Sequence, residues 1–124
     1  MFREHLPEAC PPLDAQEPSN LVVYRLIPDL PAVALHFASH ASLGKKMPGG
    51  IDPCRWASCS VFASMESVND LRKLPKFKLY KWAIKLVLGS EAGRVKSGEA
   101  GHYDWWIYSG YDPIAVAIPT ACEG

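Results

Sequence analysis

The chain has 124 residues, with 13 Lys and Arg against 13 Asp and Glu, so its formal charge at pH 7 is zero. Hydrophobic residues make up 48% and charged residues 21%, which is the composition of an ordinary globular domain. That composition excludes a disordered tail, a collagen-like chain and a uniformly basic nucleic-acid coat. The length fits one domain with one hydrophobic core.

The compartment is predicted from the N-terminal residues and the cysteines. No basic segment followed by an apolar one opens the chain, so we expect no secretory signal. No apolar run approaches the ~18–20 residues that span a bilayer, so we expect no membrane partner. We therefore expect a cytoplasmic protein whose four cysteines are reduced thiols: Cys10, Cys54, Cys59 and Cys122.

The chain is predicted to begin with an arm and continue as one domain. Residues 1–20 are rich in proline and acid and show no periodicity, which is typical of an extended or poorly ordered arm. Residues 21–124 form the predicted domain. Its first run, 21–27, is rich in β-branched and aromatic residues and stops at Pro28, which predicts a strand.

The next part of the chain is predicted as a helix, a loop and a strand. Asp29 is a suitable cap for a helix that ends near Gly44, and a short strand over 33–37 is the alternative. Residues 45–53 are dense in glycine and proline, which predicts a loop. Residues 58–63 then predict a second strand.

A second helix is predicted to begin after Ser64. The serine is a suitable N-cap, and an apolar residue recurs at helical spacing behind it. Pro75 is expected to stop the helix. Its predicted buried stripe is Met65, Val68 and Leu71.

The last third of the chain is predicted as strands joined by turns. The pattern gives a strand over 77–88, a polar loop over 91–101, and strands over 103–108 and 114–118. The sum is an α+β domain with two helices and a mixed or mainly antiparallel sheet of about five or six short strands.

The neutral total conceals three segments of opposite charge. Residues 1–20 carry net −3, residues 45–96 net +7 and residues 97–124 net −4. The basic charge is densest in residues 72–85, with six basic side chains, no acid and three aromatics. Such a mixture suits an acidic protein surface or a nucleic acid, although a half-buried strand with solvated lysines explains the same letters. Its candidate binding residues are Lys76, Lys78 and Lys81.

A second candidate binding surface is the aromatic stretch near the C-terminus, with five aromatic side chains between Tyr103 and Tyr111. We expect Trp106 to be partly exposed beside Tyr108 and Tyr111, since exposed Trp and Tyr dominate many protein interfaces. The alternative is a central strand that is covered on both faces.

Two further arrangements allow chemistry. His36 and His40 followed by Cys54 and Cys59 offer four zinc ligands, although polar histidines and small buried cysteines explain them equally. Cys59 before a predicted helix, with His102 on a later strand as its base, allows a Cys/His hydrolase.

Residues 21–88, about half the chain, resemble the ADP-ribosyltransferase superfamily. Members begin with a strand that ends in an Arg, continue with a Phe-x-Ser stretch before a Gly, and then carry a Ser-x-Ser strand that supports the nicotinamide pocket. The similar residues here are Tyr24-Arg25, Phe37-Ala38-Ser39 with Gly44, and Ser58-Cys59-Ser60.

The resemblance implies NAD as the cofactor. Arg25 would hold a pyrophosphate or ribose, and Tyr24 or Phe62 would stack on the nicotinamide. A glutamate would bind the ribose 2′-hydroxyl and stabilise the oxocarbenium-like transition state. No Glu-x-Glu motif follows, so the candidate acids are Glu91 and Glu99.

Three functions follow from the sequence. The first is a small interaction or regulatory protein, similar to an inhibitor, that binds a protein partner through the basic segment and the aromatic strand; nucleic acid is its alternative ligand. The second is an ADP-ribosyltransferase-like enzyme or toxin that acts through Arg25, Ser60 and Glu91 or Glu99. The third is a Cys/His hydrolase.

Overall fold

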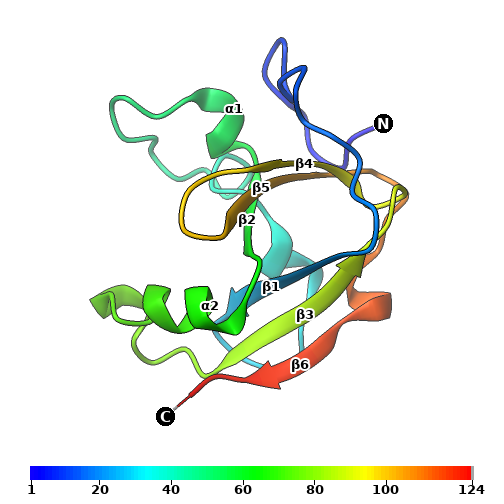
Figure 1. Ribbon diagram of the computed structural model, residues 1–124. Helices are drawn as coiled ribbons and strands as arrows, with labels where there is room; N and C mark the ends of the chain where they lie inside the picture. The colour runs from blue at the N-terminus through cyan, green and yellow to red at the C-terminus, as the bar shows by residue number, and fades with distance from the viewer. Residues whose placement is uncertain (124) are drawn as a thin grey trace.

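The computed structural model describes residues 1–123 and has one antiparallel sheet of six strands, in the order β4-β5-β2-β1-β3-β6 (Figure 1). The strands are β1 (Leu21–Ile27), β2 (Cys59–Phe62), β3 (Trp82–Leu88), β4 (Gly93–Ser97), β5 (His102–Ile107) and β6 (Ile118–Ala121). The helices are α1 (Pro53–Trp56) and α2 (Met65–Leu71), with short 3-10 helices at η1 (Ala34–Phe37), η2 (Pro75–Phe77) and η3 (Pro113–Val116). The prediction of a small α+β domain is confirmed.

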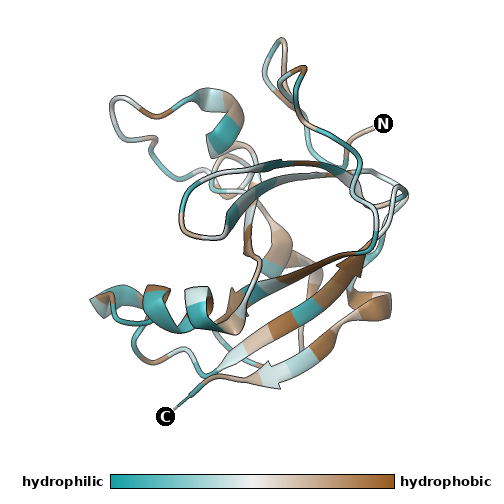
Figure 2. Cartoon of the chain, viewed as in Figure 1, coloured by the Kyte–Doolittle hydropathy of each residue, from teal (hydrophilic) through white to brown (hydrophobic). Residues whose placement is uncertain are grey.

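The main core lies on one face of the sheet. Alternate residues of the central strands point into it, and Phe37 of η1 covers them with no exposed surface. Figure 2 shows the corresponding hydrophobic colour along β3 and much of β1. The buried strand residues of this core include Val23, Ile27, Val61, Ile84, Leu86 and Trp105.

The opposite face is covered in two separate places. Helix α2 packs Val68, which has no exposed surface, against Leu26 and Ala83. The second place is Trp106 of β5, which the N-terminal arm covers. The part of this face between the two covers stays open.

Helix α2 forms as predicted. The Ser64 side chain accepts a hydrogen bond from the Ser67 backbone N–H, which satisfies one of the unpaired donors at the helix start. The helix ends at Leu71, before Pro75.

The predicted helix between Asp29 and Gly44 is wrong, and so is the alternative strand over 33–37, because only η1 forms there. Two backbone groups that a longer helix needs are bound by other parts of the chain. The Arg25 Nε–H donates to the His36 carbonyl at 3.0 Å, and the Ser39 N–H donates to the Glu4 carboxylate at 3.0 Å.

Other boundaries also differ from the prediction. The polar stretch predicted as a loop over 91–101 contains edge strand β4, and α1 forms at the end of the predicted loop over 45–53. The strand predicted over 77–88 begins only at Trp82, since Pro75 starts η2. The strand predicted over 114–118 is η3, and β6 follows it.

The N-terminal arm packs along the β4 and β5 end of the sheet (Figure 1). Phe2 bridges Tyr108, Gln16 bridges Val95, and a disulfide joins Cys10 to Cys54. The expectation of four reduced thiols is therefore wrong for Cys10 and Cys54, because the folded arm brings them together. Cys59 and Cys122 are free.

Trp106 is 1% exposed, so its predicted exposure is wrong. It packs against Ala15 and Cys54, while its neighbour Trp105 faces the main core with no exposed surface. The alternative, a strand covered on both faces, is the observed arrangement. This arrangement could not be predicted from the strand itself, because the residues that cover Trp106 belong to the N-terminal arm, far away in the sequence.

Among residues 1–123, no helix has both the length and the apolar character needed to cross a membrane.

Candidate functional site

A polar cleft lies on the open part of the sheet face, with a volume of about 540 Å³. Sites for small molecules and cofactors commonly enclose about 300–1,000 Å³. Its walls come from the β4–β5 hairpin, the α1 region and the arm, and its floor from β5. The lining residues are Pro12, Asp52, Arg55, Lys96, Ser97, Gly98, Glu99, His102, Asp104 and Trp106.

The hairpin wall depends on two close backbone approaches. Gly93 has φ +140°, and a Cβ there would lie 2.1 Å from the Trp106 carbonyl oxygen. Gly101 has φ +76°, and its Cβ would lie 2.8 Å from Ser67 Oγ of α2. Glycine is thus required where β4 meets β5 and where the hairpin meets α2.

Asp104 is the buried carboxylate of the cleft floor and is 5% exposed. It accepts hydrogen bonds from Ser58 Oγ at 3.0 Å and from Arg55 Nε at 3.2 Å. These two hydrogen bonds hold the buried carboxyl group in place, and the second one orients the Arg55 side chain.

His102 lies two residues before Asp104 on the same face of β5. Its Nε2 is 3.8 Å from Asp104 Oδ1, and its ring packs edge-to-face on Phe62 with centroids 5.4 Å apart. Burial lowers the pKa of His102 below its ordinary value of 6.5, although the neighbouring Asp104 acts in the opposite direction. The imidazole is therefore neutral at pH 7, as a proton acceptor at a cleft must be.

Two cations face the cleft. The Arg55 side chain is 58% exposed, and only its Nε is bound to Asp104, which leaves its Nη groups for a ligand. Lys96 forms an ion pair with Asp14 of the arm at 3.2 Å. A guanidinium held by a buried carboxylate is suited to bind a phosphate.

The residues of the ADP-ribosyltransferase resemblance lie around this cleft in part. Ser60 pairs with Asp104 and Phe62 with His102 across β2 and β5, so both adjoin the cleft without lining it. Glu99 lines the cleft and its carbonyl accepts from the His102 N–H. Glu91, at the β3–β4 turn, does not line it.

Arg25 and Tyr24 lie at the junction of β1 and β2. The Arg25 Nη1–H donates to the Ser60 carbonyl at 2.8 Å, and Nε–H donates to the His36 carbonyl. Tyr24 pairs with Phe62 where β1 meets β2. Arg25 therefore joins β2 to η1 from behind the cleft, and two of its donor groups are already bound.

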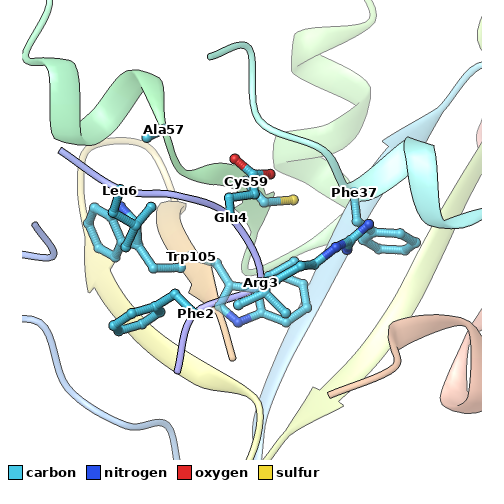
Figure 3. A pocket seen from close by; sticks show the side chains of 10 residues that line it. Phe2, Arg3, Glu4, Leu6, Phe37, Ala57, Cys59 and Trp105 are labelled. Atoms are coloured by element: carbon cyan, nitrogen blue, oxygen red, sulfur yellow. The ribbon is translucent and has the colours of Figure 1, made fainter. Parts of the chain in front are cut away.

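The structure does not bring Cys59 and His102 together. Cys59 pairs with Trp105 and His102 with Phe62, so their side chains lie on opposite faces of the sheet. Burial raises the pKa of the Cys59 thiol. Arg3 and Glu4 of the arm lie over a cavity of about 10 Å³ beside Cys59 (Figure 3), which has no room for a substrate.

The predicted zinc ligands do not form a metal site. Within residues 1–123, no three His, Cys, Asp or Glu side chains lie close enough together to hold a metal ion. Cys54 is bonded to Cys10, and His36 pairs with Asp29 at 3.2 Å.

The predicted binding residues outside the cleft divide into two groups. Lys76, Lys78 and Lys81 are exposed between α2 and β3. Tyr108 and Tyr111 are half-buried and belong to the fold, since Tyr108 donates to Glu17 at 2.6 Å and Tyr111 packs on Trp105. The aromatic strand therefore offers little free surface.

Comparison with protein-family models, curated proteins and solved structures finds no match. The sequence patterns predict Glu99 and His102 as site residues but not Asp104, Arg55 or Lys96. The His102-x-Asp104 spacing was the available signal, because it places two titratable side chains on one face of a strand.

Proposed function

We propose that the protein is an ADP-ribosyltransferase-like enzyme that binds NAD in the cleft. The observation that carries this proposal is the meeting of Glu99, His102 and Arg55 at one cleft beside β2, the strand that carries Ser60. The resemblance of residues 21–88 to the superfamily supports the choice of NAD among possible ligands.

The proposed roles differ from those expected for the resemblance at one position. Arg55, assisted by Lys96, holds the pyrophosphate, because it lines the cleft and is bound only through its Nε, while Arg25 is bound to two carbonyls. Arg25 instead fixes β2 and Ser60. His102 lines the cleft next to the nicotinamide, and Phe62 packs edge-to-face behind its ring.

The chemistry is a substitution at the nicotinamide-bearing ribose carbon. The bond from C1′ to the nicotinamide nitrogen breaks, nicotinamide leaves with the bonding electrons, and a water or a target nucleophile bonds to C1′. Glu99 binds the ribose 2′-hydroxyl and stabilises the cationic sugar. Neutral His102 takes the proton that the attacking nucleophile loses.

Nicotinamide release from NAD tests the proposal. We expect release by the wild-type protein and a loss of at least about 100-fold in Glu99→Gln, the scale of one electrostatic contact in the transition state. Glu91→Gln is the matched control, since it makes the same change outside the cleft, and it should keep full activity. No release by the wild type, or equal loss in both variants, would contradict the proposal.

A second candidate function is the binding of a protein partner. Of the two surfaces predicted for it, the basic segment is exposed, whereas the aromatic strand belongs to the fold. Its support is Leu79, which is 83% exposed among Lys76, Lys78 and Lys81. If this segment binds a partner, Lys78→Glu with Lys81→Glu should abolish capture of that partner and leave the circular dichroism spectrum unchanged. Capture that survives the double reversal would remove this function.

The cytoplasmic location stays a prediction. The Cys10–Cys54 disulfide favours an oxidising compartment instead, because disulfides persist mainly there. Trapping of free thiols in intact cells, followed by mass analysis of Cys10, separates the two: a trapped Cys10 supports the cytoplasm.

A further inference from the structure

The connection between α2 and β3 is a preformed loop with an inner and an outer side. Phe77 and Tyr80 pack edge-to-face at 5.4 Å and belong to the core under α2. Arg72 fastens the loop from within, since its Nε–H donates to the Tyr80 carbonyl and its Nη1–H to the Glu123 carbonyl. The loop therefore has little conformational entropy to lose on binding.

The outer side combines positive charge with exposed aliphatic surface. Leu79 is 83% exposed and Leu74 is 50% exposed. Lys76, Lys78 and Lys81 surround them, and none forms an ion pair with any of residues 1–123. The outer side of the loop therefore offers a partner both positive charge and exposed aliphatic surface.

The acidic arm does not neutralise this surface. It lies at the β4 and β5 end of the sheet, whereas the loop lies at the other end, beside the C-terminus (Figure 1). Three of its four acids are bound there, Glu4 to Ser39, Asp14 to Lys96 and Glu17 to Tyr108.

The arrangement favours a protein over a nucleic acid. Base stacking needs free aromatic faces, but Phe77 and Tyr80 are half-buried and packed on each other. The exposed apolar group is the aliphatic Leu79, which fits an apolar side chain of a partner.

We propose that the loop of residues 72–81 docks an acidic segment of a partner protein, with lysines on its carboxylates and Leu79 on one large apolar side chain. This inference rests on the second candidate function and is independent of the cleft. Lysine charge gives the encounter its rate and its salt dependence, and Leu79 supplies desolvated contact.

Selection from a displayed library of random 12-residue peptides tests the inference on the full chain. We expect enriched peptides that hold several Asp or Glu around a Leu, Ile or Phe. Leu79→Ser should weaken a selected peptide by about tenfold, as the loss of one buried aliphatic contact allows. Leu13→Ser removes a leucine on the acidic arm that is even more exposed than Leu79 and should change nothing.

Charge has its own matched pair. Lys78→Glu should weaken the peptide by at least about tenfold at low salt, whereas Lys46→Glu, the same change on the exposed loop before α1, should have a small effect. Circular dichroism of each variant checks that the exposed substitutions leave the fold intact.

The contradicting results are distinct. If the wild-type protein enriches no peptides beyond those that the Leu79→Ser variant retains, the loop is not a binding surface. The second candidate function then fails together with the inference. Enriched peptides without acids retain the surface and overturn its proposed partner. Tighter binding of oligo(dT) or phosphatidylserine vesicles through the same residues overturns the choice of a protein.

Discussion

Replacement of Trp106 by Ala is expected to destabilise the fold severely. The indole is 1% exposed and packs against Ala15 and Cys54, between β5 and the arm. Truncation of a buried Trp to Ala costs about 3–5 kcal/mol, because the side chain loses its burial and leaves a cavity. The variant also loses the hydrogen bond from Trp106 Nε1–H to the Cys54 carbonyl at 3.0 Å. We therefore expect a loss near the top of that range.

The magnitude approaches the whole folding free energy of a small domain, about 5–15 kcal/mol. Trp106→Phe keeps the protein measurable, because it retains most of the apolar volume and loses chiefly the hydrogen bond. We expect this variant to lose about 1–2 kcal/mol.

Urea unfolding followed by far-ultraviolet circular dichroism measures both variants without relying on tryptophan fluorescence. A loss below about 1 kcal/mol in Trp106→Ala would mean that the arm does not cover this side chain, and the first hypothesis of an exposed binding residue would return. If Trp106→Phe is as unstable as Trp106→Ala, most of the stability does not come from the packing of the indole, and the reasoning is contradicted.

Three other changes test separate parts of the structure. Ser64→Ala should cost about 1 kcal/mol in urea unfolding through loss of the α2 cap, and an unchanged midpoint would contradict the capping geometry. Cys10→Ser should cost about 2–4 kcal/mol under oxidising conditions and nothing in excess dithiothreitol; an equal cost in both would show that the disulfide is absent. Because the pKa of His102 is lowered in the fold, the unfolded chain binds the extra proton, and stability should fall as the pH drops below about 6.5, the ordinary value. His102→Gln should flatten that fall, and a slope that persists unchanged would assign the proton to another group.

Local patterns predicted the elements whose packing agrees with them. The run of β-branched residues at 21–27 and the capped stripe after Ser64 form β1 and α2 within the predicted bounds. Strand β4 was missed because, as an edge strand, it buries Val95 as its single apolar side chain besides Gly93, which is too weak an alternation for a sequence pattern. The helix predicted from Asp29 failed because its backbone partners come from distant residues.

The site was predictable only where one strand carries it. The sequence selects Glu99 as an acid implied by the resemblance and His102 as a base for Cys59, and the β4–β5 hairpin brings both to one cleft. Arg55 and Asp104 lie 49 residues apart in the sequence. Their contact depends on the register between β2 and β5, which cannot be read from either segment alone. Trp106 was misassigned for the same reason. The N-terminal arm that covers it is held by a disulfide between two cysteines that lie 44 residues apart in the sequence.

A titration of the isotope-labelled protein with NAD, followed by amide and indole shifts in nuclear magnetic resonance, tests the central claim most directly. We predict shifts at Glu99, His102, Arg55 and the Trp106 indole, and none in residues 72–81. No shifts at millimolar NAD, or shifts confined to the basic loop, would contradict the assignment of the cleft as a nucleotide site.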